Sequence, residues 1–77
     1  MILTIMRTMT GNLQKQTGQL LRMRRKARGL TLVQLEELSG VDRGYLSDAE
    51  NGKQNISLAM LERICVAMGV EVGIEMR

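Results

Sequence analysis

Glycines divide this chain into helix-length segments, because the sequence has eight glycines and no proline. A glycine after an amphipathic stretch predicts a helix end, since glycine readily adopts the left-handed conformation that closes many helices. The stretches between the glycines carry apolar residues at helical spacing. They predict four helices, which span residues 13–28, 32–39, 43–50 and 58–68. The expected fold class is therefore all-α, a compact four-helix domain.

Polar residues mark the starts of three of these helices. Thr31 followed by Gln34 is a capping-box pattern, which predicts that a helix begins at Leu32. Asp42 and Ser57 are suitable N-caps for the third and fourth helices, because their side chains can accept a hydrogen bond from an amide of the first turn.

The apolar side chains that recur along each helix predict the core. Among them, Cys65 is expected to be a small buried apolar residue and not a reactive thiol. The residues expected to face the core are Leu13, Leu20, Met23 and Ala27, with Leu21 beside them, in the first helix; Leu35 and Leu38 in the second; Leu46 and Ala49, with Tyr45 at the edge, in the third; and Leu58, Leu61, Ile64, Cys65 and Met68 in the fourth.

The two ends of the chain have the patterns of short strands. "MILTIM", residues 1–6, is apolar with β-branched members, and "VEVGIEMR", residues 70–77, alternates apolar and polar residues. We expect an N-terminal segment of residues 1–12, a helical domain of residues 13–69 and a C-terminal strand of residues 70–77. The strands can pair with each other in a hairpin or across a dimer, and the sequence leaves both alternatives open.

The composition argues against an enzyme. The sequence has no histidine and a single cysteine, which removes the commonest general base and leaves neither a disulfide nor a zinc site. We therefore expect no catalytic residues, no cofactor and no metal. No apolar run is long enough to span a membrane, and the lone cysteine fits a cytoplasmic protein.

A basic run, "RMRRKAR" over residues 22–28, holds five of the eleven lysines and arginines. Such a run forms either the solvated face of a helix or a surface that faces phosphates. With a net charge of only +3, charge alone favours the solvated face.

The second and third predicted helices are separated by a tight turn with a glycine, which matches a helix-turn-helix unit. Sorting the third helix by angle places a set of small polar residues and one arginine on its outward side. Such a surface suits a DNA groove, where an arginine can bind guanine through two hydrogen bonds. The outward residues are Arg43, Gly44, Ser47, Asp48 and Asn51.

Residues 18–70 resemble the Cro/CI-type (XRE) helix-turn-helix family of DNA-binding repressors, whose fold is lambda repressor-like. The segments that carry the resemblance are "LLRMRRKARGLT", "QLEELSGVD", "YLSDAENGKQNIS" and "LERICVAMGV", in the order and spacing of the family pattern. The resemblance implies that double-stranded DNA is the partner.

The resemblance also implies roles for single residues. Arg25 would pair with Glu50 and fix the angle of the third helix, so Arg25 is not counted as a DNA contact. The residues at positions where the family reads bases are Arg43, Gly44, Ser47 and Asp48. Those at positions where the family holds phosphates are Thr31, Tyr45, Asn51, Lys53, Gln54 and Asn55.

Several residues depart from the family pattern. Leu32 stands in place of a glutamine that reaches a phosphate, and Asp48 brings a negative charge into the groove. Glu36 replaces a small residue between the two helices, so it must tilt outward or find a partner such as Arg24 or Arg43. Ala49 replaces a larger aliphatic residue, which predicts thin packing beneath the third helix.

The C-terminal strand resembles that of HipB-like antitoxins, in which two subunits pair such strands. This resemblance implies dimer contacts through Val70, Val72, Ile74 and Met76. We therefore expect a homodimeric, sequence-specific transcriptional regulator that binds a near-palindromic operator and acts as a repressor. One alternative is an antitoxin that binds a toxin and regulates its own operon. Another is a protein-interaction domain that has lost DNA binding.

Overall fold

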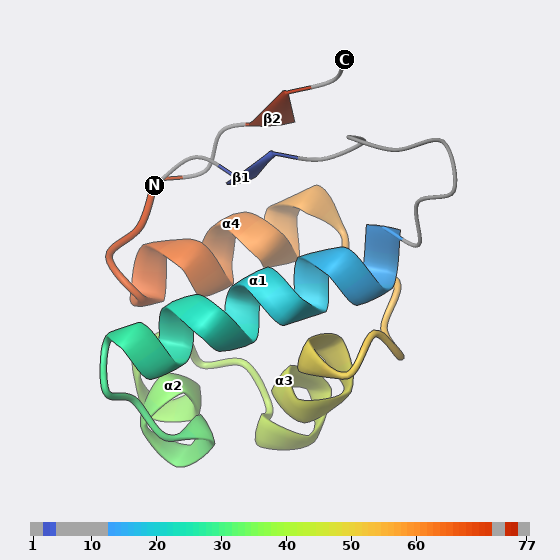
Figure 1. The fold of residues 1–77 in the computed structure, drawn as a ribbon. Coiled ribbons are helices and arrows are strands. Elements are labelled where there is room, and N and C mark those ends of the chain that lie inside the picture. The colour runs from blue at the N-terminus through green and yellow to red at the C-terminus, as the bar shows by residue number, and fades with distance from the viewer. Residues whose placement is uncertain (1–2, 5–12, 72–73, 76–77) are drawn as a thin grey trace.

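A computed structural model describes residues 3–4, 13–71 and 74–75 of the chain. Helices make up most of it, as Figure 1 shows. Helix α1 packs against α3, and α2 packs against both α3 and α4. The expected all-α, four-helix fold is confirmed. In chain order the elements are β1 (Leu3–Thr4), α1 (Leu13–Ala27), α2 (Leu32–Ser39), α3 (Arg43–Glu50), α4 (Leu58–Ala67) and β2 (Ile74–Glu75).

The helix starts predicted from capping residues are confirmed. Thr31 Oγ1 accepts a hydrogen bond from the Gln34 amide at 3.1 Å, and Gln34 Oε1 accepts one from the Thr31 amide at 2.8 Å. Asp42 and Ser57 cap α3 and α4 in the same way, each through the amide three residues on. Gly40 ends α2 with a φ of 71°, a conformation that glycine adopts without strain.

The core lies between the four helices and is built from aliphatic and sulfur-containing side chains. Most of the predicted core residues of α2, α3 and α4 are confirmed, and Cys65 has no exposed surface. Tyr45 is half-buried at the edge, as expected. The buried cluster consists of Leu21, Leu35, Val41, Leu46, Leu61, Ile64, Cys65 and Met68.

Some predicted core positions are wrong. Leu38 and Leu58 are exposed by 60% and 67%, and each lies at one end of its helix, where few neighbours can cover it. In α1 the predicted face is displaced: Leu13, Met23 and Ala27 are exposed, and Leu20 is half-buried. The helix instead buries Thr17, Gly18, Leu21 and Arg25.

The buried face of α1 follows from a close approach to α3. A Cβ built on Gly18 would overlap the carbonyl oxygen of Ala49 and lie 2.8 Å from that of Glu50. Only glycine permits this contact between a helix face and the backbone of a neighbour. Ala49 has no exposed surface, so the expected thin packing beneath α3 is wrong. Because Gly18 has no side chain, the backbones of α1 and α3 approach closely, and the small side chain of Ala49 is fully buried.

Strands β1 and β2 pair in parallel within the chain, with Leu3 opposite Ile74 and Thr4 opposite Glu75. The pairing is therefore not the hairpin that was one alternative, since the two strands run in the same direction. Figure 1 shows them side by side above α1 and α4. The other expected strand residues at the two ends lie outside the described residues, except Val70 and Glu71. Val70 packs against the core.

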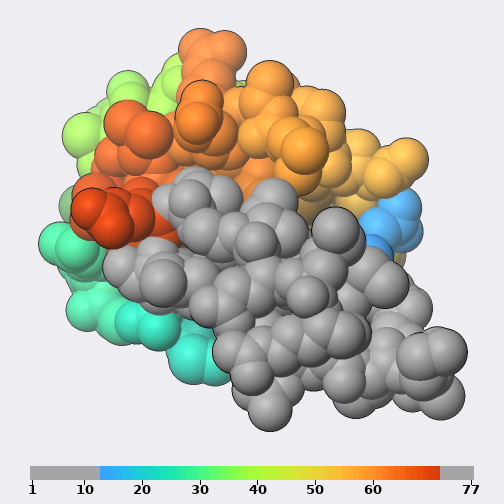
Figure 2. All heavy atoms as spheres, turned by 90° about the horizontal axis from the view of Figure 1, so that it is seen from above, coloured from blue at the N-terminus to red at the C-terminus, as the bar shows by residue number. Residues whose placement is uncertain are grey.

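Figure 2 looks down on the side of the molecule opposite to α2 and α3, where α4 and the two ends of α1 form the described surface. On α4, Leu58 and Val66 are exposed by 67% and 68%, and Glu62 between them is exposed as well. Within the described residues, none of the helices combines the length and the apolar character needed to cross a bilayer.

Candidate nucleic-acid interface

The turn between α2 and α3 is held by buried polar contacts. Ser39 Oγ donates to the Leu35 carbonyl at 2.7 Å and accepts from the Val41 amide at 3.1 Å. Val41 is itself 4% exposed and belongs to the core. From α4, Arg63 Nε donates to the Ser39 carbonyl at 2.8 Å. These contacts fix how α3 leaves α2, which is the angle that a helix-turn-helix unit presents to DNA.

Helix α3 separates its apolar and polar residues onto two sides. Leu46 and Ala49 are buried, while Arg43, Gly44 and Asp48 are exposed and Ser47 is half-buried. The structure therefore brings the four predicted base-reading positions onto one accessible side. Within the described part of the chain, the guanidinium of Arg43 has no hydrogen-bond or ion-pair partner.

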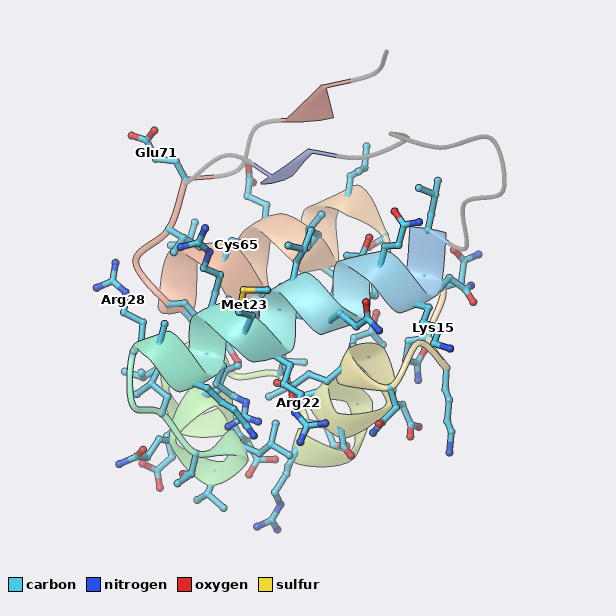
Figure 3. The ribbon with its side chains drawn as sticks, in the orientation of Figure 1. Lys15, Arg22, Met23, Arg28, Cys65 and Glu71 are labelled. Carbon is cyan, nitrogen blue, oxygen red and sulfur yellow. The ribbon has the colours of Figure 1, made fainter. Side chains whose placement is uncertain are left out.

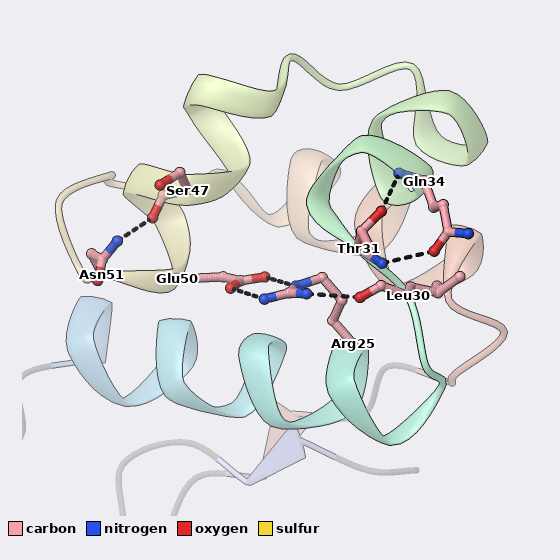
Figure 4. Close-up of polar contacts among 7 residues, drawn as sticks. All are labelled: Arg25, Leu30, Thr31, Gln34, Ser47, Glu50 and Asn51. Carbon is pink, nitrogen blue, oxygen red and sulfur yellow. Dashed lines mark hydrogen bonds and ion pairs between the residues drawn. The ribbon is translucent and has the colours of Figure 1, made fainter.

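Arg25 and Glu50 join the end of α1 to the end of α3 (Figure 4). Arg25 Nε lies 2.6 Å and Nη2 3.0 Å from the two carboxylate oxygens of Glu50, and Nη1 donates to the Leu30 carbonyl at 2.7 Å. Their side chains are 10% and 7% exposed. The hydrogen bond with Glu50 raises the pKa of the Arg25 guanidinium, against the opposing effect of burial. This pairing is the one that the family resemblance implied, and together with the Leu30 contact it engages all three nitrogens of the guanidinium.

The basic run of α1 divides into structural and exposed residues. Besides Arg25, Arg28 is engaged, because its Nη2 donates to the Gly69 carbonyl at 3.0 Å and so closes the end of α4. Arg22, Arg24 and Lys26 are exposed. Figure 3 shows Arg22 on the side of α1 that faces α2 and α3, and Arg28 at the opposite end of the domain from Lys15. The charge available to a partner is therefore smaller than the sequence suggests.

The predicted phosphate-binding residues fall into three places, one of which is α3, where Tyr45 is half-buried. Thr31 is at the start of α2, with its hydroxyl engaged in the capping box. The others, apart from Tyr45, lie in the turn after α3, where Lys53 and Asn55 are exposed and Gln54 is half-buried.

Asn51 shapes the start of that turn, because its Nδ2 donates to the Ser47 carbonyl at 2.9 Å (Figure 4). The Lys53 amide donates to the Asp48 carbonyl at 2.8 Å. Gly52 has a φ of 74°, and a Cβ there would lie 2.9 Å from Lys15 Cα, so the turn is seated closely on α1.

Glu36 was expected to tilt outward or to find a partner such as Arg24 or Arg43. The partner is Arg43, whose backbone amide donates a hydrogen bond to Glu36 Oε2 at 2.7 Å. The signal in the sequence was an acidic residue at a helix–helix contact, but nothing in the pattern pointed to a backbone donor.

Chemistry other than binding has little support among the described residues. They contain no group of three or more His, Cys, Asp or Glu side chains that could hold a metal ion. Burial raises the pKa of the Cys65 thiol and keeps it protonated.

The helix-turn-helix family matches residues 21–74, which include the whole unit and most of the domain. The chain belongs to the Cro/CI-type (XRE) helix-turn-helix family. The proteins that it resembles include a phage immunity repressor and the transcriptional regulator ClgR.

Three relatives of this XRE-family chain illustrate the match. The immunity repressor protein of Bacillus phage phi105 is 44% identical over 56 residues, which cover 73% of the chain and 39% of the repressor. The restriction-modification controller protein C.AhdI from Aeromonas hydrophila is 40% identical, with a TM-score of 0.69 over 71% of the chain and 83% of C.AhdI. The clp gene regulator ClgR from C. glutamicum is 38% identical, with a TM-score of 0.72 over 74% of the chain and 73% of ClgR. The chain thus spans well under half of the length of the phage repressor.

Proposed function

We propose that this protein is a sequence-specific transcriptional repressor that binds a near-palindromic operator as a homodimer in the cytoplasm. The observation that carries the proposal is the outward side of α3, where Arg43, Gly44 and Asp48 are exposed on a helix whose other side is fixed to the core. A fixed helix with exposed hydrogen-bonding groups can read base edges in the major groove.

In this proposal, affinity and sequence choice come from different residues. The start of α2 and the turn after α3, with Thr31, Lys53 and Asn55, bind phosphates on either side of the groove and supply salt-dependent affinity. Arg43 and Ser47 supply the choice of sequence through base edges. Asp48 accepts a hydrogen bond from a cytosine amino group, which is the base-edge partner suited to a carboxylate.

A second subunit would double the contact with DNA. Two copies of α3 about 34 Å apart can enter successive turns of the major groove on one side of the duplex. The exposed apolar residues Leu58 and Val66, two turns apart on α4, support the proposal that this side faces another subunit. Dimer contacts through Val70, Val72, Ile74 and Met76 stay a proposal, although Val70 packs against the core and Ile74 pairs with Leu3 of the same chain. The phage immunity repressor among the relatives supports repression as the outcome.

Fluorescence anisotropy tests the proposal with the DNA upstream of the gene and a scrambled duplex of the same composition. The Arg43→Ala variant is measured in parallel over a series of salt concentrations. The matched control is Arg24→Ala, which removes an exposed arginine from α1, outside the helix-turn-helix unit.

We expect tighter binding to the upstream DNA, a steep loss of affinity with salt, and loss of the sequence preference only in Arg43→Ala. A bidentate arginine–guanine contact accounts for about 1–3 kcal/mol of such discrimination. Equal, weak binding to both duplexes by the unaltered protein would contradict the proposal. Light scattering during size-exclusion chromatography checks the dimer, and a monomer at the concentrations that bind DNA would exclude it.

A further inference from the structure

The first turn of α3 is surrounded by two carboxylates of its own chain. Glu36 Oε2 accepts from the Arg43 amide at 2.7 Å, and Asp42 Oδ2 accepts from the Tyr45 amide at 3.1 Å. A Cβ built on Gly44 would lie 2.9 Å from Asp42 Oδ2, which places this carboxylate beside Gly44 as well. Two negative charges therefore lie beside the first backbone amides of α3, which have no hydrogen-bond partner within the helix.

A helix start without such residues attracts anions. The first amides of a helix have no partner within the helix, and the aligned peptide dipoles add a partial positive charge at this end. Phosphates therefore bind readily at helix starts. In α3 the amides of Arg43 and Tyr45 are already occupied by carboxylates, which also repel an approaching phosphate.

The start of α2, in the same unit, is different. Thr31 and Gln34 cap it with neutral groups, and its first turn contains no acidic residue. Among the described residues, neither Glu36 nor Asp42 forms an ion pair that would cancel its charge. The neighbouring cations are directed elsewhere: Arg63 donates to the Ser39 carbonyl, and Arg43 is exposed on the outward side.

We propose that Glu36 and Asp42 form a specificity-determining pair that keeps DNA phosphates away from the start of α3. With phosphates kept away, the start of α3 can contact only base edges. Glu36 also positions Arg43, because its carboxylate binds the Arg43 amide. Affinity for DNA of any sequence is thereby lowered, while the preference for the operator is raised. This inference rests on the proposed function, because it concerns how the same helix chooses its DNA.

Two neutral variants test the pair without removing the caps. Glu36→Gln keeps an oxygen that can accept from the Arg43 amide, and Asp42→Asn keeps the cap, since asparagine caps helices as well as aspartate does. The control is Glu37→Gln on α2, an exposed site next to Glu36 with the same change of charge. Each full-length variant is titrated with the scrambled duplex and with the upstream duplex, and its urea unfolding is measured.

We expect Glu36→Gln and Asp42→Asn to bind the scrambled duplex roughly threefold more tightly than Glu37→Gln does, because a phosphate can then approach the helix start. The preference for the upstream duplex falls in the same two variants, and their unfolding midpoints stay near that of the unaltered protein. Glu36→Ala, which lacks the acceptor, should lose stability, and the glutamine variant restores it.

The inference is overturned if the two neutral variants bind the scrambled duplex no more tightly than Glu37→Gln. It is also overturned if they weaken both duplexes in proportion to a loss of stability, which would make the carboxylates purely structural. Should the unaltered protein show no sequence preference, the proposed function fails, but the comparison on the scrambled duplex still decides whether the carboxylates repel phosphate.

Discussion

Gly18 of α1 lies against the backbone of Ala49 in α3, so closely that a Cβ on Gly18 would overlap the Ala49 carbonyl oxygen. The two helices meet through main-chain atoms, and α3 takes its position relative to the core from this contact. Ala49 is fully buried beside it. The contact fixes the depth of α3, just as Arg25 and Glu50 fix its end.

Gly18→Ala tests the first of these constraints. The added methyl group forces α1 and α3 apart, because backbone atoms cannot move aside as a flexible side chain can. We expect a loss of about 3 kcal/mol in the free energy of unfolding, the upper range for overpacking a core. Urea unfolding followed by circular dichroism measures it. Gln19→Ala, at the next and exposed position of α1, is the control, and a similar loss in both variants would contradict the argument.

A double-mutant cycle tests the ion pair of Arg25 and Glu50. Removing Arg25 leaves the Glu50 carboxylate buried without its cation, so Arg25→Met should cost about 3 kcal/mol of stability. Replacing both residues by methionine should cost less than the sum of the two single replacements, because no charge then remains buried. Unfolding free energies of the three variants give the coupling. Additive losses would show that the pair does not hold the helices together.

Cys65 offers a test of burial through pH. Burial raises its pKa above the ordinary value of 9.0, so the folded state keeps the proton longer than the unfolded state. The unfolded chain then releases protons first as the pH rises, and this stabilising contribution is complete below pH 9 and declines above it. Between pH 7 and pH 10, the unaltered protein should therefore lose more unfolding free energy than Cys65→Ala. Equal losses of unfolding free energy in the two proteins would indicate that the Cys65 thiol is in contact with water.

Lys53→Ala tests the division between phosphate and base contacts. Lys53 is exposed in the turn after α3, and its loss should weaken binding to operator and scrambled DNA by similar factors. The slope of log affinity against log salt should become shallower by about 1, the contribution of one phosphate contact. Anisotropy titrations at several salt concentrations measure the slope. A selective loss of operator binding would instead place Lys53 among the base-reading residues.

Capping residues and glycines were the parts of the sequence that predicted structure best. The starts of α2, α3 and α4 depend on side chains that bind amides three residues away, so a short stretch contains all the information needed. The outward side of α3 was predictable for a similar reason, because Leu46 and Ala49 fix which way an eight-residue helix faces.

The buried face of α1 could not be predicted from hydrophobicity. It contains Gly18 and Arg25, one with no side chain and one with a charge, and both are buried because of partners far away in the sequence. Gly18 meets the backbone of α3, and Arg25 meets a carboxylate 25 residues on. Met23 was placed in the core by its periodicity, but its side chain is 58% exposed. Arg43 was foreseen as a possible partner of Glu36, but the sequence did not indicate that the contact is made by the main-chain amide across the turn.

The contacts that hold α3 in place all reach it from the inside or from its two ends. Gly18 lies beneath it, its own Leu46 is buried in the core, Glu36 and Asp42 hold its first turn, and Arg25 holds Glu50 at its last. The exposed positions of α3, such as Arg43 and Asp48, contribute no side-chain contact to this framework among the described residues. Their identities can change while the scaffold stays intact, so a new operator preference could be selected by exchanging those residues without a compensating change elsewhere in the domain.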